Sequence, residues 1–189
     1  MPSRPPVALV ALSSLVLLPA AWFRGGGRRP FEAHGRELRA YRTTVTTQTS
    51  RIDSVLGDLG DLVDALRRRD VDIDEAIDRL AAGEGELDGI AEEMRDMEAP
   101  EDLHELHLEY EANLERALRG IVTAERGCGL TRQRHRPVED EEPLAYWKRG
   151  YANIVHSRLR MAEVAEVMVA WEPGRPTVAD VSARVRKHG

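Results

Sequence analysis

Cysteine is almost absent from this sequence of 189 residues, where Cys128 stands alone. A single cysteine excludes an internal disulfide framework and any zinc or iron–sulfur site that needs several thiolates. Aromatic residues make up only 5% of the chain, and no stretch shows the sustained alternation of a half-buried strand. The core must therefore come from Leu, Val, Ile and Ala, which is typical of a helical protein.

The motifs of common active sites are missing as well. The chain has no phosphate-binding loop, no glycine fingerprint for a dinucleotide and no nucleophile elbow. It has no Cys-x-x-Cys-His motif for covalent haem. We therefore expect neither an enzyme nor a cofactor. No concentrated basic surface is predicted either, so we expect no nucleic acid among the partners.

What the chain does have is an uneven distribution of charge. Residues 70–111 hold 17 acidic side chains against two basic ones, Arg79 and Arg95, and the segments on both sides are net basic. This block indicates either a cationic external partner or an acidic hairpin lying against basic neighbours in the same fold. We favour internal balance from the sequence. Only two of the basic residues are lysines, Lys148 and Lys187, which is typical of a high-GC, bacterial coding sequence.

The longest apolar run is Val7–Phe23, 17 residues without a charge. As a helix it would extend about 25 Å, near the lower limit for crossing a bilayer. Trp22 and Phe23 close the run and Arg24 follows, an order typical of a membrane interface. Cleavage after Ala21 or Ala20 would put Pro19 or Leu18 at position −3, where a signal peptidase needs a small residue. We expect an uncleaved anchor that contacts the membrane through residues 7–23.

The alternatives to an anchor are a cleaved signal peptide, giving a secreted protein, and a buried helix. Arginine counts favour a helical domain on the cytoplasmic side, since Arg24, Arg28 and Arg29 outnumber Arg4. The usual arrangement of a short N-terminal anchor is the reverse, and we expect the domain outside the cytoplasm.

Four helices follow from the three-four spacing of apolar residues. The first covers about 32–69, with a heptad seam interrupted by Gln48. The second starts at a capping box, Asp72–Glu75. The third begins at Pro100 and is expected to end at the Gly127-Cys128-Gly129 sequence. The fourth begins at Pro143, and its expected inward residues are Leu144, Trp147, Tyr151, Ile154, Val155, Leu159, Ala162, Ala165, Val169 and Trp171.

Short links between four amphipathic helices predict an all-α protein, an up-down-up-down four-helix bundle. One N-terminal hydrophobic helix precedes the bundle and a short C-terminal helix follows it. The expected domains are an anchor and Gly-rich tether at 1–30, the bundle at 31–172 with a charged loop near 127–142, and a Pro/Gly break with a basic helix at 173–189.

Glu101 and His104 form a Glu-x-x-His motif, which on a bundle helix resembles the ligand spacing of di-iron proteins. The candidate metal ligands are therefore His104 with His107 and Glu111, which follow on the same helix. A helical wheel turns His104 and Glu111 toward solvent and puts His107 at the edge of the core. Glu84 lies between Gly83 and Gly85, so either a kink turns it outward or it is a buried carboxylate poised for a ligand. No second Glu-x-x-His is present, so we expect no bundle-core metal site.

The function expected from these observations is a membrane-anchored interaction or structural module. Its expected contact surface for a protein partner, or for self-association, comprises Asp74, Asp78, Asp88 and Glu92. The alternative is a sensory or storage bundle that binds a small ligand or a metal through Glu84, His104, His107 and Glu111.

Overall fold

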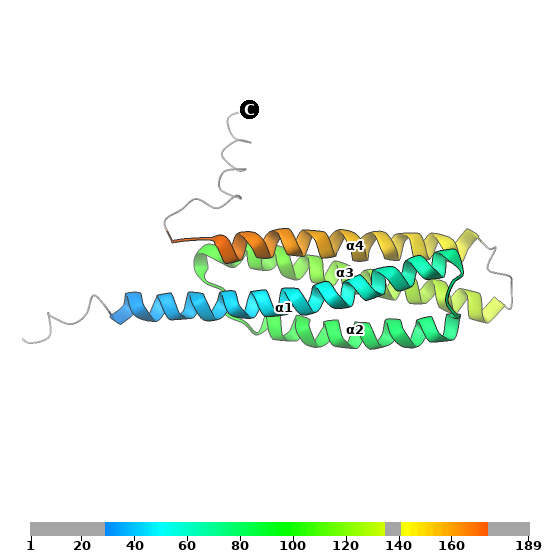
Figure 1. Ribbon diagram of the computed structural model, residues 1–189, viewed down its shortest axis with the longest axis horizontal. Helices are drawn as coiled ribbons and strands as arrows, with labels where there is room; N and C mark the ends of the chain where they lie inside the picture. The colour runs from blue at the N-terminus through cyan, green and yellow to red at the C-terminus, as the bar shows by residue number, and fades with distance from the viewer. Residues whose placement is uncertain (1–28, 135–140, 174–189) are drawn as a thin grey trace, which may run out of the picture. The chain divides into compact units, whose positions relative to one another are not determined.

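The structure, a computed structural model, describes residues 29–134 and 141–173, and these are all-helical (Figure 1). Four helices follow one another: α1 (Arg29–Arg68), α2 (Ile73–Arg95), α3 (His104–Arg134) and α4 (Glu141–Ala170), with a 3-10 turn, η1 (Glu101–Leu103), before α3. The prediction of an all-α chain with four helices is confirmed for this part, which contains no strand. The expected anchor and C-terminal helix lie outside it.

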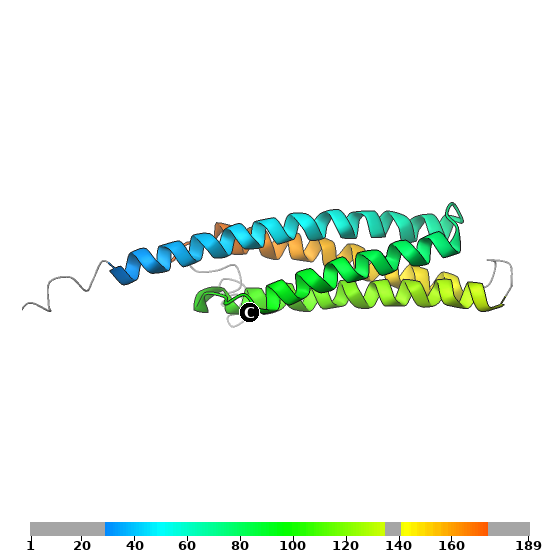
Figure 2. The ribbon, with the colours of Figure 1, turned by 90° about the horizontal axis from the view of Figure 1, so that it is seen from below.

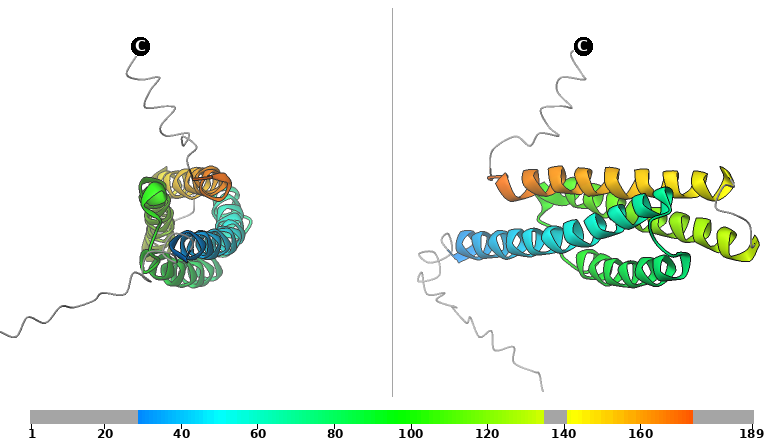
Figure 3. Two further views of the ribbon diagram at one scale, coloured as in Figure 1. Left: turned by 90° about the vertical axis from the view of Figure 1, so that its left-hand side faces the viewer. Right: turned by 45° about the vertical axis from the view of Figure 1, so that its right-hand side comes forward.

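The chain divides into two compact units, Met1–Arg36 and Glu37–Gly189. The second unit holds the hydrophobic core, to which all four helices contribute. From Glu37 onward the ribbons lie side by side in the views of Figures 2 and 3. None of the helices described is both long enough and apolar enough to cross a membrane.

Contacting helices in the second unit run antiparallel, because residue numbers rise along one helix as they fall along the other. The contacts are Gln48 with Glu93 and Leu59 with Gly83 between α1 and α2, Asp74 with Arg132 and Met94 with His107 between α2 and α3, Glu109 with Arg160 and Gly120 with Gly150 between α3 and α4, and Asp53 with Arg158 and Gly60 with Val155 between α1 and α4.

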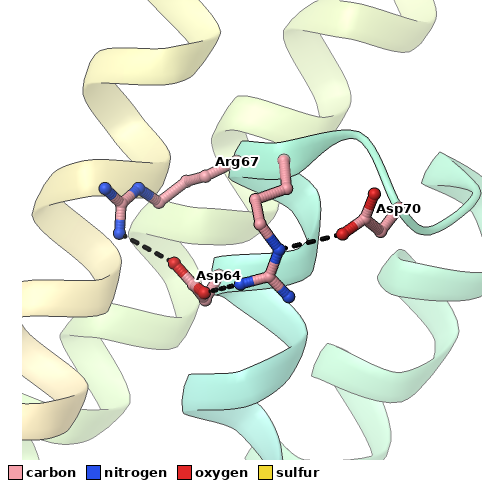
Figure 4. Close-up of polar contacts among 4 residues, drawn as sticks. Asp64, Arg67 and Asp70 are labelled. Atoms are coloured by element: carbon pink, nitrogen blue, oxygen red, sulfur yellow. Dashed lines mark hydrogen bonds and ion pairs between the residues drawn. The ribbon is translucent and has the colours of Figure 1, made fainter.

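The end of α1 is held by a small charge network (Figure 4). The Asp64 carboxylate accepts a 3.0 Å hydrogen bond from Arg67 and another from Arg68, whose Nε donates to Asp70 at 2.9 Å. Arg69 then adopts a left-handed backbone, with φ at 67°, and the Asp70 amide donates to the carbonyl of Ala65. This closing pattern satisfies carbonyls that the last helical turn leaves free.

The prediction that the third helix ends at Gly127–Gly129 is wrong, because α3 continues to Arg134. Gly127 instead lies under the indole of Trp147. A Cβ atom at Gly127 would be 2.7 Å from Trp147 Nε1. The glycine thus permits a close contact between α3 and α4 and does not terminate the helix.

The predicted inward face of α4 is wrong in its second half. Leu159 is 60% exposed, Val169 is 38% exposed and Ala162 is exposed as well. The buried residues are Ser157, Met161, Val164, Ala165 and Met168. Ser157 is polar and fully buried. Because a polar residue occupies this inward position, the apolar residues after Ile154 led the prediction to the wrong side of the helix.

Candidate functional site

The acidic helix α2 begins at a well-formed cap. The Asp72 side chain accepts hydrogen bonds from the backbone amides of Asp74 at 2.9 Å and Glu75 at 3.3 Å. Acidic groups in the first turn also interact favourably with the positive end of the helix dipole. The predicted helix start is therefore confirmed.

Three of the four predicted contact residues lie on one stripe of α2. Measured around the helix from Asp78, the positions of Asp74 and Glu92 fall within about 40°, and Asp88 lies about 80° away. All four side chains are exposed. We call these four residues the acidic face of α2.

Two glycines lie beside these acidic residues on the same side of α2. Gly85 and Gly89 are exposed and lie within about 20° of Asp78 around the helix. A Cβ atom at either glycine would meet nothing within 4 Å. Packing inside the molecule therefore does not explain these two glycines, although each weakens the helix by about 1 kcal/mol relative to alanine. The face is open to close approach by another helix or strand.

Ion pairs to other helices neutralise only a small part of the charge on α2. Asp74 lies 3.8 Å from Arg132 of α3, and Glu93 lies 3.5 Å from Arg51 of α1. Within the described ranges, no ion pair or hydrogen bond joins Asp78, Asp88 or Glu92 to a basic side chain. Basic side chains of the neighbouring helices thus neutralise less of the acidic block than expected. Three charges of the acidic face stay available to a partner.

Of the candidate metal ligands, only His107 and Glu111 come close to each other. His104 is exposed, while His107 is buried and turned toward the core. Glu111 is partly exposed, with a carboxylate oxygen 3.6 Å from His107 Nε2. Among the side chains that the structure describes, those of residues 35–133 and 141–173, no group of three or more from His, Cys, Asp or Glu is placed to hold a metal ion.

Glu84 lies far from these histidines and next to another acid. The helix α2 runs unbroken through Gly83 and Gly85, and Glu84 is half-buried. A Cβ atom at Gly83 would be 2.7 Å from the Leu59 side chain of α1, so this glycine allows close packing. Partial burial, and secondly the charge of Glu84, raise the pKa of Glu125 on α3 above its ordinary value. Glu84 is therefore one of two adjacent like charges.

The sequence interpretation missed a buried polar node formed by Tyr41 and His107. The Tyr41 hydroxyl lies 3.0 Å from His107 Nδ1 and 3.3 Å from the sulfur of Met168. His107 Nε2 lies 3.1 Å from the backbone carbonyl of Met94. These four residues come from α1, α3, α4 and α2 respectively. The one available signal was the position of His107 between Leu103 and Tyr110 on the apolar face of α3.

Cys128 is fully buried on α3 and is not placed as a nucleophile. Burial raises the pKa of its thiol to about 11. A thiol with so high a pKa is almost entirely protonated at neutral pH, and the thiolate is the reactive form.

Compared with protein-family models, with curated proteins and with solved structures, the chain has no match.

Proposed function

We propose that this protein is a membrane-anchored, non-catalytic helical module that binds a cationic protein partner through the acidic face of α2. The observation that carries this proposal is the set of exposed, unpaired carboxylates at Asp78, Asp88 and Glu92 beside two glycines that no internal contact requires. A partner bearing Arg or Lys would neutralise the carboxylates and pack its backbone against the glycines.

The proposed scaffold is an up-down-up-down four-helix bundle. Antiparallel contacts between α1 and α2, α2 and α3, α3 and α4, and α4 and α1 support it. The links between α1 and α2 and between α2 and η1 are short, as this topology requires. Such a scaffold would present α2 on its outside as a rigid, charged rod.

The proposed anchor is the apolar run Val7–Phe23, followed by a Gly-rich tether. Its length, the terminal Trp22 and Phe23, and the arginines that follow support membrane insertion. We place the helical unit on the extracytoplasmic side, with the cytoplasmic side as the alternative.

The test is site-specific photo-crosslinking in cells. A photoreactive amino acid at Ala82, an exposed position on the same side of α2, is expected to give a crosslinked product with the partner. Reversing two charges, Asp78→Lys with Glu92→Lys, is expected to remove that product, because the cationic partner would then be repelled.

The matched control reverses two exposed acids elsewhere, Glu105→Lys on α3 with Glu166→Lys on α4, and keeps the crosslinker at Ala82. The product should persist in this variant. Undiminished crosslinking in the Asp78→Lys, Glu92→Lys variant would contradict the proposal, as would equal loss in both variants.

Metal analysis separates this function from metal storage or sensing. We expect protein purified without a histidine tag to contain far less than one equivalent of any transition metal, because no three of the described candidate ligands converge. One equivalent of bound metal, lost in a His107→Gln variant, would favour the alternative.

A further inference from the structure

The Tyr41–His107 node connects all four helices through two side chains. Tyr41 extends from α1 to His107 of α3 and to Met168 of α4, and His107 reaches the Met94 carbonyl of α2. Both side chains are buried, at 4% exposure each. A change in the bonding of either residue therefore reaches the whole helical unit.

The Tyr41 hydroxyl has one proton and two acceptors within reach. His107 Nδ1 lies 3.0 Å away and Met168 Sδ 3.3 Å away. Burial, followed by the charge of Glu111, raises the pKa of this hydroxyl above its ordinary value, so the proton stays on the oxygen. Because one O–H group cannot donate fully to both acceptors, the state of Nδ1 decides between them.

In neutral His107 the proton belongs on Nε2. That nitrogen faces the Met94 carbonyl at 3.1 Å, and a carbonyl only accepts hydrogen bonds. Nδ1 is then an unprotonated acceptor, and the Tyr41 hydroxyl donates to it. The Met168 sulfur receives no hydrogen bond in this state.

Protonated His107 has N–H groups on both nitrogens. Nε2 keeps its bond to Met94, while Nδ1–H now donates to the Tyr41 oxygen. The hydroxyl proton must turn away from Nδ1, and Met168 Sδ is the acceptor in place. The Tyr41 hydroxyl thus donates to His107 when the ring is neutral and to Met168 when the ring is protonated.

Two sources of negative charge lie near His107. Met94 lies in the last turn of α2, whose carbonyl end carries the negative pole of the helix dipole. Glu111 lies 3.6 Å from Nε2 on α3. From α1 the titratable group is Tyr41, with Arg42 next to it in the chain, and from α3 Tyr110 is also near Tyr41. Among the described residues, α2 and α4 bring only the Met94 carbonyl and the Met168 thioether into hydrogen-bond contact.

We infer that Tyr41 and His107 form a proton-operated switch: protonation of His107 moves the hydrogen bond of the Tyr41 hydroxyl from α3 to Met168 on α4. The neutral state donates from α1 to α3, and the charged state donates from α1 to α4 and from α3 to α1. The switch would make the junction of the four helices sensitive to the pH of the compartment.

NMR of the full chain in mild detergent tests this switch. The sample carries ¹³C-methyl methionine and ¹⁵N-histidine, and pH is varied over the range in which the protein stays folded. The Met168 methyl resonance is assigned with Met168→Leu and the His107 ring with His107→Gln. We expect the Met168 methyl shift to follow the titration of His107 with the same midpoint.

Three controls make the outcome specific. Tyr41→Phe removes the hydroxyl and is expected to abolish the Met168 response while His107 still titrates. The Met161 methyl, buried on the same helix, should not follow the titration. His104→Gln should leave the Met168 response unchanged. A Met168 shift that ignores His107, or that persists in Tyr41→Phe, would overturn the switch, as would a His107 ring that does not titrate in the folded protein.

Discussion

Ser157 shows how one buried polar side chain can weaken the core. It is fully buried on α4, and its hydroxyl has no hydrogen-bond partner among the described residues. A buried hydroxyl without a partner loses its bonds to water and gains none in return. We expect Ser157→Ala to raise the free energy of unfolding by about 1 kcal/mol, measured by urea denaturation. Ser54→Ala, at an exposed position of α1, corrects for helix propensity, and an equal gain in both variants would contradict the argument.

Glu125 is a second single residue that lowers stability, and its effect depends on pH. Its pKa is raised by burial and by Glu84, so its ionised form destabilises the folded state. We expect Glu125→Gln to stabilise the protein at neutral pH by about 0.5 kcal/mol. The gain should be complete above the folded-state pKa and vanish as the pH falls below the unfolded-state value of about 4.3. Urea midpoints from pH 3 to 8 measure this, with Glu105→Gln on the exposed side of α3 as the control; a constant gain at every pH would refute it.

At the scale of elements, the helical glycines fall into two classes. A Cβ atom at Gly150 would lie 2.8 Å from the backbone oxygen of Gly120 and 3.0 Å from Ala124, so α3 and α4 touch through their backbones. We expect Gly150→Ala to destabilise the protein by about 1–3 kcal/mol despite the better helix propensity of alanine. Gly89→Ala, where nothing lies near, should stabilise it by about 1 kcal/mol. Thermal unfolding of the two variants decides the matter, and shifts of the same sign would be inconsistent with this division.

Element identity could be predicted from sequence because apolar residues recur at helical spacing over long stretches. The exact faces could not. Ser157 and the methionines of α4 obscured its inward side, and the glycine at position 127 resembles a helix end although Trp147 requires it. The acidic face was predictable, since exposure of charged residues follows directly from the periodicity. The Tyr41–His107 node was not, because a hydrogen bond between residues 66 positions apart depends on tertiary packing.

For the whole molecule, the main prediction concerns the membrane. Deleting residues 7–23 is expected to release the protein from the membrane fraction, because this uncharged apolar run is the anchor that we propose. Fractionation followed by alkaline washing measures this, and a reporter fused to the C-terminus, active on one side only, gives the sidedness. Retention of the deleted form in washed membranes would show that another segment binds the membrane.

Labelling of Cys128 can measure how fast the folded protein opens. The chain has no other thiol, and this one is sealed within the packed core, with Trp147 beside it. A thiol reagent can modify it only after the core around it opens, so labelling under native conditions proceeds no faster than that opening. At high reagent concentration the labelling rate becomes the opening rate itself. The opening rate of the core can therefore be measured on the natural protein, without an introduced cysteine or other probe.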